Sequence, residues 1–456
     1  MKKFDVIIGG AGFAGIYAAW RLAKSGCSVA LLEAENGIGG NLNSRQWGKF
    51  WLDNGTHNFD MRTKLGNDFF QDIMGDDLQI WTEPYWASTM NKSWSHGFEM
   101  PDLSKENPTL AAQALTELQK IKKEWRSDIN SESYIESYRQ SYGPTLTATT
   151  LRLVKKFTGS DPTCLSAEAG QSLGIFDRPK LGTDKEMITF KKSDPFWDKR
   201  LGVSLLSDDN KFSGKSIKFK VGYPKKRGLM GFCINAQRRL EELGVQIKLG
   251  HKIDNIENDR AGIYVTAENT RFSAKKIFWS LSEIGLSKVL GTGIDFTQDF
   301  IPVGTCLFAF EVSEKDVKGP GYLHDFHPER ACFRYNKMGV YSQQVHSKGN
   351  TIVMAEVPSH PVDIPKNTTL NMSKVVWQNI CDSEFVRPID QPIASTCWGL
   401  PVAFTLPRIG WRSNFIKLQE MINNKLPDLH FIGFGPRGRT SYMSYYDRNL
   451  HDFLQN

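Results

Sequence analysis

The sequence predicts an α/β protein whose second domain is α+β. Three observations predict this class. A strand, a glycine turn, a helix and a second strand fill the first 33 residues, helical stretches follow from about residue 60, and alternating strand-like runs follow residue 300. With 456 residues the chain exceeds the size at which one hydrophobic core keeps growing. We therefore expect two interleaved domains.

The N-terminal segment has the order of a βαβ unit. The apolar run Phe4–Ile8 is typical of a buried parallel strand and leads into Gly10-Ala11-Gly12-Phe13-Ala14-Gly15. Apolar residues at helical spacing continue to Lys24, and a second strand, Ser28–Leu32, ends in Glu33.

Each part of this pattern has a physical role in a Rossmann-type dinucleotide site. Gly10 permits the tight turn. Gly12, which lies in the same turn as Ala14, lets a pyrophosphate approach the N-terminus of the helix. Gly15 lets the helix and the strand pack closely. Glu33 would accept hydrogen bonds from ribose hydroxyls. A purely structural glycine turn is the alternative, but the ordered context favours a dinucleotide.

A second glycine element, Gly39-Gly40-Asn41, follows the acidic residue. At this point the sequence resembles the flavoprotein group of flavin amine oxidases, protoporphyrinogen oxidases and UDP-galactopyranose mutases. The resemblance implies FAD, with the glycine pair around its diphosphate, because pyridine-nucleotide dehydrogenases usually lack this pair. Most members carry Arg after the pair, whereas mutases tend to have Asn, as here.

The segment Leu52–His57 resembles the part of these families that passes under the isoalloxazine ring. The resemblance implies that Asn54, Gly55 and Thr56 contact the cofactor and that His57 lies against the ring as a catalytic residue. A loop histidine with ordinary hydrogen-bond partners is the alternative for His57.

The middle of the chain has sequence patterns typical of helices. Helices are expected at Thr109–Arg126, Ser131–Tyr142 and Thr145–Phe157. The run from 138 to 170 resembles the helical substrate-domain segment of protoporphyrinogen-oxidase-like proteins, although a generic helical insertion would read the same.

A cationic run follows. Seven cations and no acids lie between Lys211 and Arg227. Such a run usually forms a surface exposed to solvent. Two more specific interpretations are that it binds an anionic small-molecule substrate, such as a nucleotide-sugar diphosphate, or that it contacts an anionic membrane surface peripherally. The net charge of +7 is too diffuse to indicate nucleic acid. No run of about 18 apolar residues predicts a membrane-spanning segment.

A second dinucleotide element is expected after this run. Tyr223–Gly231 opens a helix through Leu243 and resembles the second FAD element of the same group. The resemblance implies that the backbone at Ile253 meets the adenine and that Ser280, after a strand Arg271–Trp279, lies near the diphosphate. Three further segments with alternating apolar residues are expected to be strands of an antiparallel sheet: Val303–Glu311, Gly339–Val345 and Asn350–Val357. In the family, this sheet forms the floor of the substrate-binding cavity.

The C-terminal element begins with a short strand, Leu429–Ile432, followed by a glycine-rich turn and a helix-like segment from 441 to 454. Its resemblance to the mutase ending implies that Gly433 and Gly435 let the flavin lie flat against the backbone. It further implies that Arg439 neutralises substrate phosphate or flavin charge and that Tyr445 donates a hydrogen bond to the diphosphate. Asp447 would cap or orient near the ribityl chain.

The cysteines indicate neither disulfides nor a metal site. They are odd in number and show no CxxC or Cys/His ligand spacing, so reduced thiols in a cytoplasmic protein are expected: Cys27, Cys164, Cys233, Cys306, Cys332, Cys381 and Cys397. Cys397 lies where monoamine oxidases attach flavin covalently, but a buried structural thiol is the favoured interpretation. Lys2 and Lys3 before an apolar run resemble a signal peptide, but Asp5 interrupts that run.

Together these features predict a discontinuous Rossmann-type FAD-binding domain at 1–60, 221–295 and 405–456. The antiparallel sheet and the helices would form a substrate domain at 61–220 and 296–404. The expected function is an FAD-dependent oxidoreductase in which flavin N5 accepts hydride from a small molecule, a sugar or glycan precursor being the first class to test. The alternatives are a mutase-like isomerase without net redox, and a non-catalytic binding protein of the GDP-dissociation-inhibitor type, against which the intact glycines argue. The oligomeric state is not indicated.

Overall fold

The computed structural model describes residues 3–55, 58–61, 63–81, 86–91, 94–97, 100–125, 131–203, 220–259, 262–340 and 349–432, with residues 443, 447 and 450. The chain divides into two compact units. Unit 1 consists of 1–79, 222–300 and 410–456, and unit 2 consists of 80–221 and 301–409. Unit 1 is therefore discontinuous in sequence. The assignment of the units as FAD-binding and substrate domains stays a prediction.

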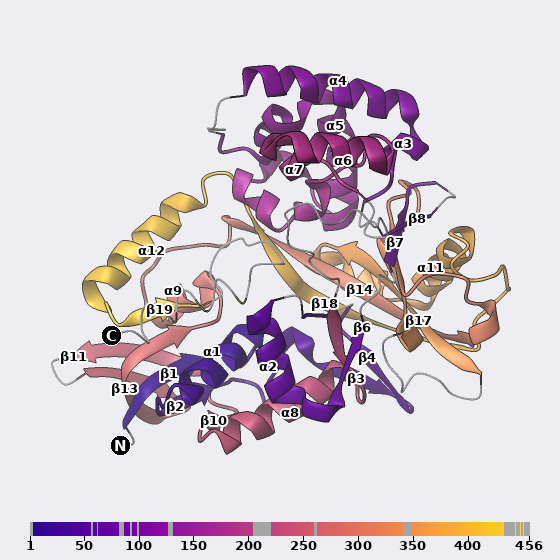
Figure 1. Ribbon diagram of the computed structural model, residues 1–456. Helices are drawn as coiled ribbons and strands as arrows, with labels where there is room; N and C mark the ends of the chain where they lie inside the picture. Colours follow the sequence, from indigo (N-terminus) through magenta and orange to yellow (C-terminus); the bar gives the residue numbers. More distant parts are fainter. Residues whose placement is uncertain are drawn as a thin grey trace. The chain divides into compact units, whose positions relative to one another are not determined.

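Unit 1 is built on a seven-stranded sheet with the order β10-β2-β1-β13-β12-β11, in which β19 also pairs with β13 (Figure 1). The pairs β10–β2, β2–β1, β1–β13 and β13–β19 are parallel, and β13–β12–β11 is antiparallel. The strands are β1 (Lys3–Gly9), β2 (Val29–Leu32), β10 (Gln246–Lys248), β11 (Ile253–Asp259), β12 (Gly262–Ala267), β13 (Thr270–Trp279) and β19 (Leu429–Phe431).

The central strands are apolar because both of their faces are covered. Val6, Ile7 and Ile8 of β1 are fully buried, as expected for a parallel sheet with helices on its faces. The helix α1 (Phe13–Lys24) connects β1 to β2, which confirms the predicted βαβ unit. The helices α9 (Glu283–Val289) and α12 (Arg412–Lys425) contribute to the core around β11–β13.

The first segment of unit 1 extends past the expected boundary at residue 60. It includes the helix α2 (Lys64–Met74), which lies with α1 and with α8 (Leu229–Glu242) beside the sheet (Figure 1). Rings from all three helices meet: Phe69 and Phe70 of α2 contact Phe13 of α1 and Phe232 of α8. This aromatic packing makes α2 part of unit 1.

Two small sheets were not predicted. One pairs β3 (Ser44–Trp47) with β4 (Phe50–Asp53) in an antiparallel hairpin. The other has the order β5-β9-β6, with β5 at Phe59–Asp60, β9 at Val221–Pro224 and β6 at Leu78–Trp81. The strands are short and lack a long alternating pattern, so the sequence carried little signal for them.

Unit 2 contains a second seven-stranded sheet with the order β18-β14-β17-β16-β15-β7-β8. Among the strand pairs of this sheet with a described register, only β15–β7 is parallel, so the predicted antiparallel sheet is confirmed as mostly antiparallel. Its strands are β7 (Trp86–Thr89), β8 (Ser95–His96), β14 (Phe300–Ser313), β15 (Tyr322–Asp325), β16 (Arg334–Lys337), β17 (Asn350–Ser359) and β18 (Ala394–Pro407).

One expected strand is wrong where it can be seen. Met338–Val340 form a short 3-10 helix instead of the start of a strand, and residues 341–348 lie outside the described part. The strand of this region is β16, which precedes the expected segment. Tyr335 of β16 is fully buried, and Arg334 pairs with Glu356 of β17. One face of this sheet packs against α11 (Leu370–Asp382), preceded by α10 (Ile364–Asn367).

The helical part of unit 2 comprises α3 (Leu103–Glu106), α4 (Pro108–Glu124), α5 (Tyr134–Thr158), α6 (Asp184–Ser193) and α7 (Pro195–Arg200). α5 is interrupted at Gly143, whose φ of +83° is not helical, and Pro144 follows without an N–H. The two helices predicted here are thus halves of one kinked element. Glu117 of α4 accepts a hydrogen bond from the backbone N–H of Thr145 at 2.9 Å and so caps the second half.

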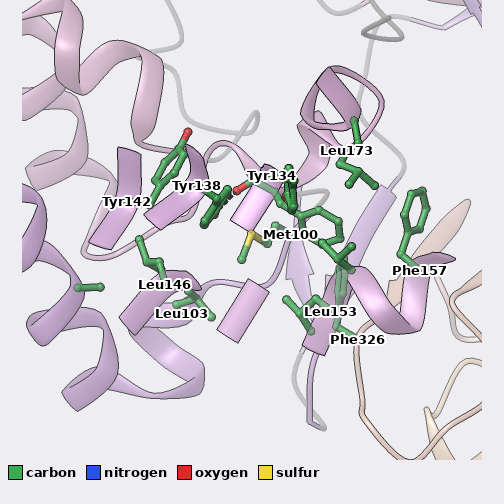
Figure 2. Packing of buried hydrophobic residues seen from close by; sticks show 14 of the residues in the cluster. Met100, Leu103, Tyr134, Tyr138, Tyr142, Leu146, Leu153, Phe157, Leu173 and Phe326 are labelled. Carbon is green, nitrogen blue, oxygen red and sulfur yellow. Dashed lines mark hydrogen bonds between the residues drawn. The ribbon is translucent and has the colours of Figure 1, made fainter. Parts of the chain in front are cut away.

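The first half of α5 carries three tyrosines on its buried side. Figure 2 shows Tyr134, Tyr138 and Tyr142 in sequence along the helix, with Leu146 and Leu153 continuing into the same cluster. Tyr138 and Tyr142 stack with ring centroids 4.4 Å apart, and the Tyr138 hydroxyl donates to the Phe176 carbonyl at 2.8 Å. The spacing of four residues places these rings on one helical face.

Next to this cluster lies Asp177, whose carboxyl is expected to make the stability of unit 2 depend on pH. Burial raises the pKa of Asp177 to about 7, although Arg178 and Arg200 oppose the shift. An aspartate in the unfolded chain titrates near ~3.9. The native state therefore binds the extra proton between these values, and stability falls as the pH rises from about 4 to about 7.

We expect Asp177→Asn to remove this dependence. In urea unfolding, the difference in unfolding free energy between variant and wild type should shift by about 1–3 kcal/mol in favour of the variant between pH 4 and pH 8. Parallel pH profiles of the two proteins would contradict the assignment.

Candidate functional site

The glycine turn at the end of β1 is as tight as the motif requires. Gly10 has a φ of +93°, and a Cβ atom placed on it would lie 2.6 Å from the Leu281 side chain. Ser280 closes the turn, since its hydroxyl donates to the carbonyls of Gly9 and Gly10 at 2.8 and 3.0 Å. The structure thus brings Ser280, predicted near the diphosphate, to the first glycine turn.

The next two glycines of the motif serve different purposes. A Cβ on Gly15 would overlap with the carbonyl oxygen of Gly10, so this glycine allows α1 to pack against the turn. Gly12 is the N-cap of α1, and a Cβ placed on it would meet no atom of the described residues within 4 Å. The first N–H groups of a helix lack intrahelical partners and favour anions. A helix N-terminus with open space before it fits a diphosphate.

The second glycine element joins the first directly. Gly12 and Gly39 form a parallel β-bridge, and the Gly39 N–H donates to the Ala11 carbonyl at 2.8 Å. Gly39 and Gly40 have φ values of +117° and +56°, which favour glycine. A Cβ on Gly40 would lie 3.5 Å from the Gly12 Cα. We call Gly10, Gly12, Gly15, Gly39 and Gly40 together the glycine cradle.

Glu33 lies at the end of β2 beside this cradle. Its Oε2 accepts a hydrogen bond from the Ala11 N–H at 2.7 Å and its Oε1 accepts one from the Glu35 N–H at 3.0 Å. Both bonds hold the carboxylate in place, and each oxygen has a further lone pair for a ligand hydroxyl.

We expect Glu33→Gln to lower dinucleotide affinity about 10-fold, because an amide has one acceptor oxygen for the two N–H groups and the ligand. Isothermal titration with FAD measures the change. Asp254→Asn, an acid-to-amide change at the start of β11, is the matched control. Equal affinity of Glu33→Gln and wild type would remove Glu33 from the site.

Other predicted contacts lie around the cradle. Asn54 donates from Nδ2 to the Asn43 carbonyl at 2.9 Å, just after the glycine pair, and Gly55 follows with a φ of +106°. The Cδ1 of Ile253, at the start of β11, lies 3.0 Å from a Cβ placed on Gly9. Asn41 is exposed within the short 3-10 helix Gly40–Leu42.

Asp447 contacts two side chains of α1. Its Oδ1 accepts hydrogen bonds from Arg21 Nε at 2.9 Å and from the Tyr17 hydroxyl at 3.1 Å, both on α1 beyond its first turn. These contacts attach the C-terminal segment to α1, and a role near the ribityl chain stays a prediction. The other site residues predicted at the C-terminus and near the flavin ring lie outside the described residues: Thr56, His57, Gly433, Gly435, Arg439 and Tyr445.

Cys397 lies in β18 of unit 2 and packs against the core of that sheet beside Cys306. Its side chain is partly buried, and its role as a structural thiol stays a prediction. In the described part of the chain, no group of His, Cys, Asp and Glu side chains could hold a metal ion. The described helices also include none with the length and apolarity to cross a membrane.

Sequence reasoning missed two residues beneath the cradle. A Cβ on Gly39 would overlap with the sulfur of Cys233, which is buried on α8. Burial, with a contribution from Asp53, raises the pKa of the Cys233 thiol to about 12, so the thiol is neutral. Asp53 itself is 1% exposed at the end of β4. The one feature of the sequence that could have indicated a role for Asp53 is its position as a charged residue at the end of an apolar strand.

Comparisons with known proteins agree with this geometry. A family model described as an NAD(P)-binding Rossmann-like domain matches residues 8–73, the segment that carries the cradle and Glu33. Among curated proteins, none matches the sequence.

Solved structures match over almost the whole chain at low identity. A reduced UDP-galactopyranose mutase is 16% identical, with a TM-score of 0.67 over 99% of this chain and 94% of that one. A protein from Exiguobacterium sp. 255-15 assigned as a protoporphyrinogen oxidase is 12% identical, with a TM-score of 0.68 over 100% and 99%. An engineered putrescine oxidase is 14% identical, with a TM-score of 0.64 over 100% and 99%.

The fold and the cradle define a mixed α/β protein with a dinucleotide-binding Rossmann-like domain and a second, mostly antiparallel sheet. This is the flavin amine oxidase fold, as the sequence resemblance implied. The chain shares that fold with UDP-galactopyranose mutase as well as with the oxidases.

Proposed function

We propose that this protein is an FAD-dependent oxidoreductase that acts on a small molecule. The observation that carries the proposal is the β-bridge between Gly12 and Gly39, which unites two glycine elements in front of the N-terminus of α1. A single Rossmann glycine motif supports any dinucleotide. The second glycine pair supports FAD, because the flavoprotein group that the sequence resembles uses such a pair around the diphosphate.

The residues of the cradle fit this cofactor. The backbones of Gly12, Gly39 and Gly40 would hold the diphosphate, Glu33 the ribose hydroxyls and the Ile253 backbone the adenine. When bound, FAD supplies the acceptor atom N5 for a hydride from the substrate. The remaining proposed cofactor contacts are Gly10, Ala14, Gly15, Asn41, Asn54, Gly55, Thr56, Ser280, Gly433, Gly435 and Asp447, and the proposed catalytic residues are His57, Arg439 and Tyr445.

An anionic sugar derivative or glycan precursor is the substrate class we propose to test first. It is supported by the resemblance to sugar-nucleotide mutases and by the cations before α8, of which Lys220, Lys225, Lys226 and Arg227 are described. Cations at such a position would lower the free energy of a bound phosphate.

A mutase-like isomerase without net redox is the second candidate. Asn41 after the glycine pair favours it, and so does the fold shared with UDP-galactopyranose mutase over 99% of this chain. The two functions differ in their electron balance: an oxidoreductase consumes a stoichiometric acceptor, and an isomerase does not.

One experiment separates these candidates. The purified protein is loaded with FAD and mixed anaerobically with nucleotide sugars and with amines, while absorbance near 450 nm is followed. Bleaching by a substrate supports the oxidoreductase. Turnover of a nucleotide sugar only after dithionite reduction, without bleaching of the oxidised protein, supports the isomerase. A protein that binds no FAD contradicts both and favours a non-catalytic role.

A further inference from the structure

Asp53 is the most buried acid in unit 1 for which three hydrogen bonds are described. It accepts them from the Ser44 hydroxyl at 2.6 Å, the Leu229 N–H at 3.0 Å and the Tyr223 hydroxyl. Burial raises the pKa of the carboxyl, and the three hydrogen bonds oppose the shift. Burying a carboxyl group costs free energy unless all of its hydrogen-bond partners are in place.

The partners of Asp53 define where α8 begins. Leu229 is the first residue of α8, and the N–H of the second, Met230, donates to the Ser44 hydroxyl at 3.0 Å. The N-cap is Gly228, with a φ of +55°, and a Cβ on it would lie 2.6 Å from Asp53 Oδ1. Only glycine allows this close approach, so the N-terminus of α8 is seated directly on the end of β4.

Two parts of the proposed FAD site depend on this contact between the N-terminus of α8 and the end of β4. The first is the glycine pair, because Cys233, in the second turn of α8, lies against Gly39 where any side chain would overlap with its sulfur. The second is Asn54, which follows Asp53 in the chain and donates to the Asn43 carbonyl. A shift of Asp53 or of α8 therefore moves both segments together.

We propose that Asp53 is a positioning residue for the bound flavin dinucleotide: by seating α8 on β4, it sets the Gly39–Gly40 turn through Cys233 and the Asn54–Gly55 segment through the chain. The inference rests on the proposed FAD function. It differs from a structural role for Asp53, in which loss of the carboxyl would lower stability and leave the environment of the flavin unchanged.

Asp53→Asn tests the inference. The amide group has one acceptor oxygen and puts N–H donors in place of the other, so at least one of the three hydrogen bonds is lost or reversed and the contact between α8 and β4 is weakened. We expect FAD affinity to fall about 10-fold or more, with a changed flavin absorption spectrum and reduction potential. The measurements are FAD titration, spectroelectrochemistry of the loaded protein and thermal unfolding without FAD.

Asp72→Asn is the matched control. Asp72 also contacts α8, through Arg239, and accepts a hydrogen bond from Trp20 at 2.6 Å, but no described contact joins it to the cradle or to Asn54. It should lower the unfolding temperature while FAD affinity, flavin spectrum and potential stay those of the wild type.

Cys233 supplies a second test that leaves Asp53 in place. Cys233→Ser is nearly isosteric and should bind FAD with wild-type affinity and spectrum. Cys233→Leu puts extra carbons against Gly39 and should weaken FAD binding about 10-fold. If Asp53→Asn does not fold, this pair of variants decides the question.

The outcomes separate the two proposals. Wild-type affinity, spectrum and potential in Asp53→Asn, together with a lower unfolding temperature, would overturn the positioning role alone. The same holds for wild-type FAD binding by Cys233→Leu. A wild-type protein without flavin absorbance after incubation with FAD would overturn the proposed function and this inference with it.

Discussion

Gly12→Ala is expected to weaken FAD binding about 100-fold without unfolding the protein. Among the residues that the structure describes, none has an atom within 4 Å of a Cβ placed on Gly12, and the backbone conformation, with a φ of −71°, suits any residue. Alanine in place of glycine at an N-cap changes stability only slightly. The methyl group would instead occupy the space before α1, where the diphosphate must approach the N–H groups. We expect affinity to fall about 100-fold, roughly 2.7 kcal/mol.

Fluorescence titration of FAD and thermal unfolding without cofactor measure the two quantities separately. Gly15→Ala should lose both binding and stability, because its Cβ overlaps with the Gly10 carbonyl. Gly37→Ala, in the same region but with nothing within 4 Å and no positive φ, should bind as the wild type does. Wild-type affinity in Gly12→Ala would mean that no ligand approaches the start of α1.

Phe69→Ala is expected to be the most destabilising single change among those considered for unit 1. Phe69 is fully buried on α2, and its ring contacts those of Tyr17 and Trp20 at 5.2 and 5.1 Å, along with Phe13, Phe70 and Phe232. Truncating such a side chain leaves a cavity between α1, α2 and α8. The expected loss in unfolding free energy is about 3–5 kcal/mol.

Urea unfolding and hydrogen exchange of α1 and α2 amides report this loss. Ile234→Ala, on α8 with the side chain 43% exposed, is the control and should cost less than about 1 kcal/mol. Similar losses in both variants would show that the aromatic cluster does not hold the three helices together. Since Phe13 belongs to the glycine motif, FAD affinity should also fall in Phe69→Ala.

Local patterns sufficed for the first βαβ unit. Strand β1, the turn at Gly10–Gly15, helix α1 and strand β2 are contiguous, and each has its own periodicity or glycine spacing. The residues that the motif assigns, including Glu33, lie where expected beside the turn. The Gly39–Gly40 pair could be predicted as part of the same site because its family pattern is short and close in sequence.

Contacts between distant segments could not be predicted in this way. The ring packing of Phe69 with Phe232 placed α2 in unit 1, although the sequence pattern suggests a boundary at residue 60, before α2 begins. The strand β16 was misplaced because its pairing with β17 depends on cross-strand partners such as Arg334 and Glu356. Neighbours across a sheet leave no fixed spacing in the sequence.

The sequence by itself determined the fold class, the two glycine elements and Glu33, because glycines and acids at fixed short spacings report local backbone requirements. The tertiary structure decided that Gly12 and Gly39 form one cradle, that Cys233 lies beneath it and that Asp53 seats α8. It also showed Asp447 bound to Arg21 of α1. These features depend on the packing of segments that lie far apart in the chain, which only the folded arrangement specifies.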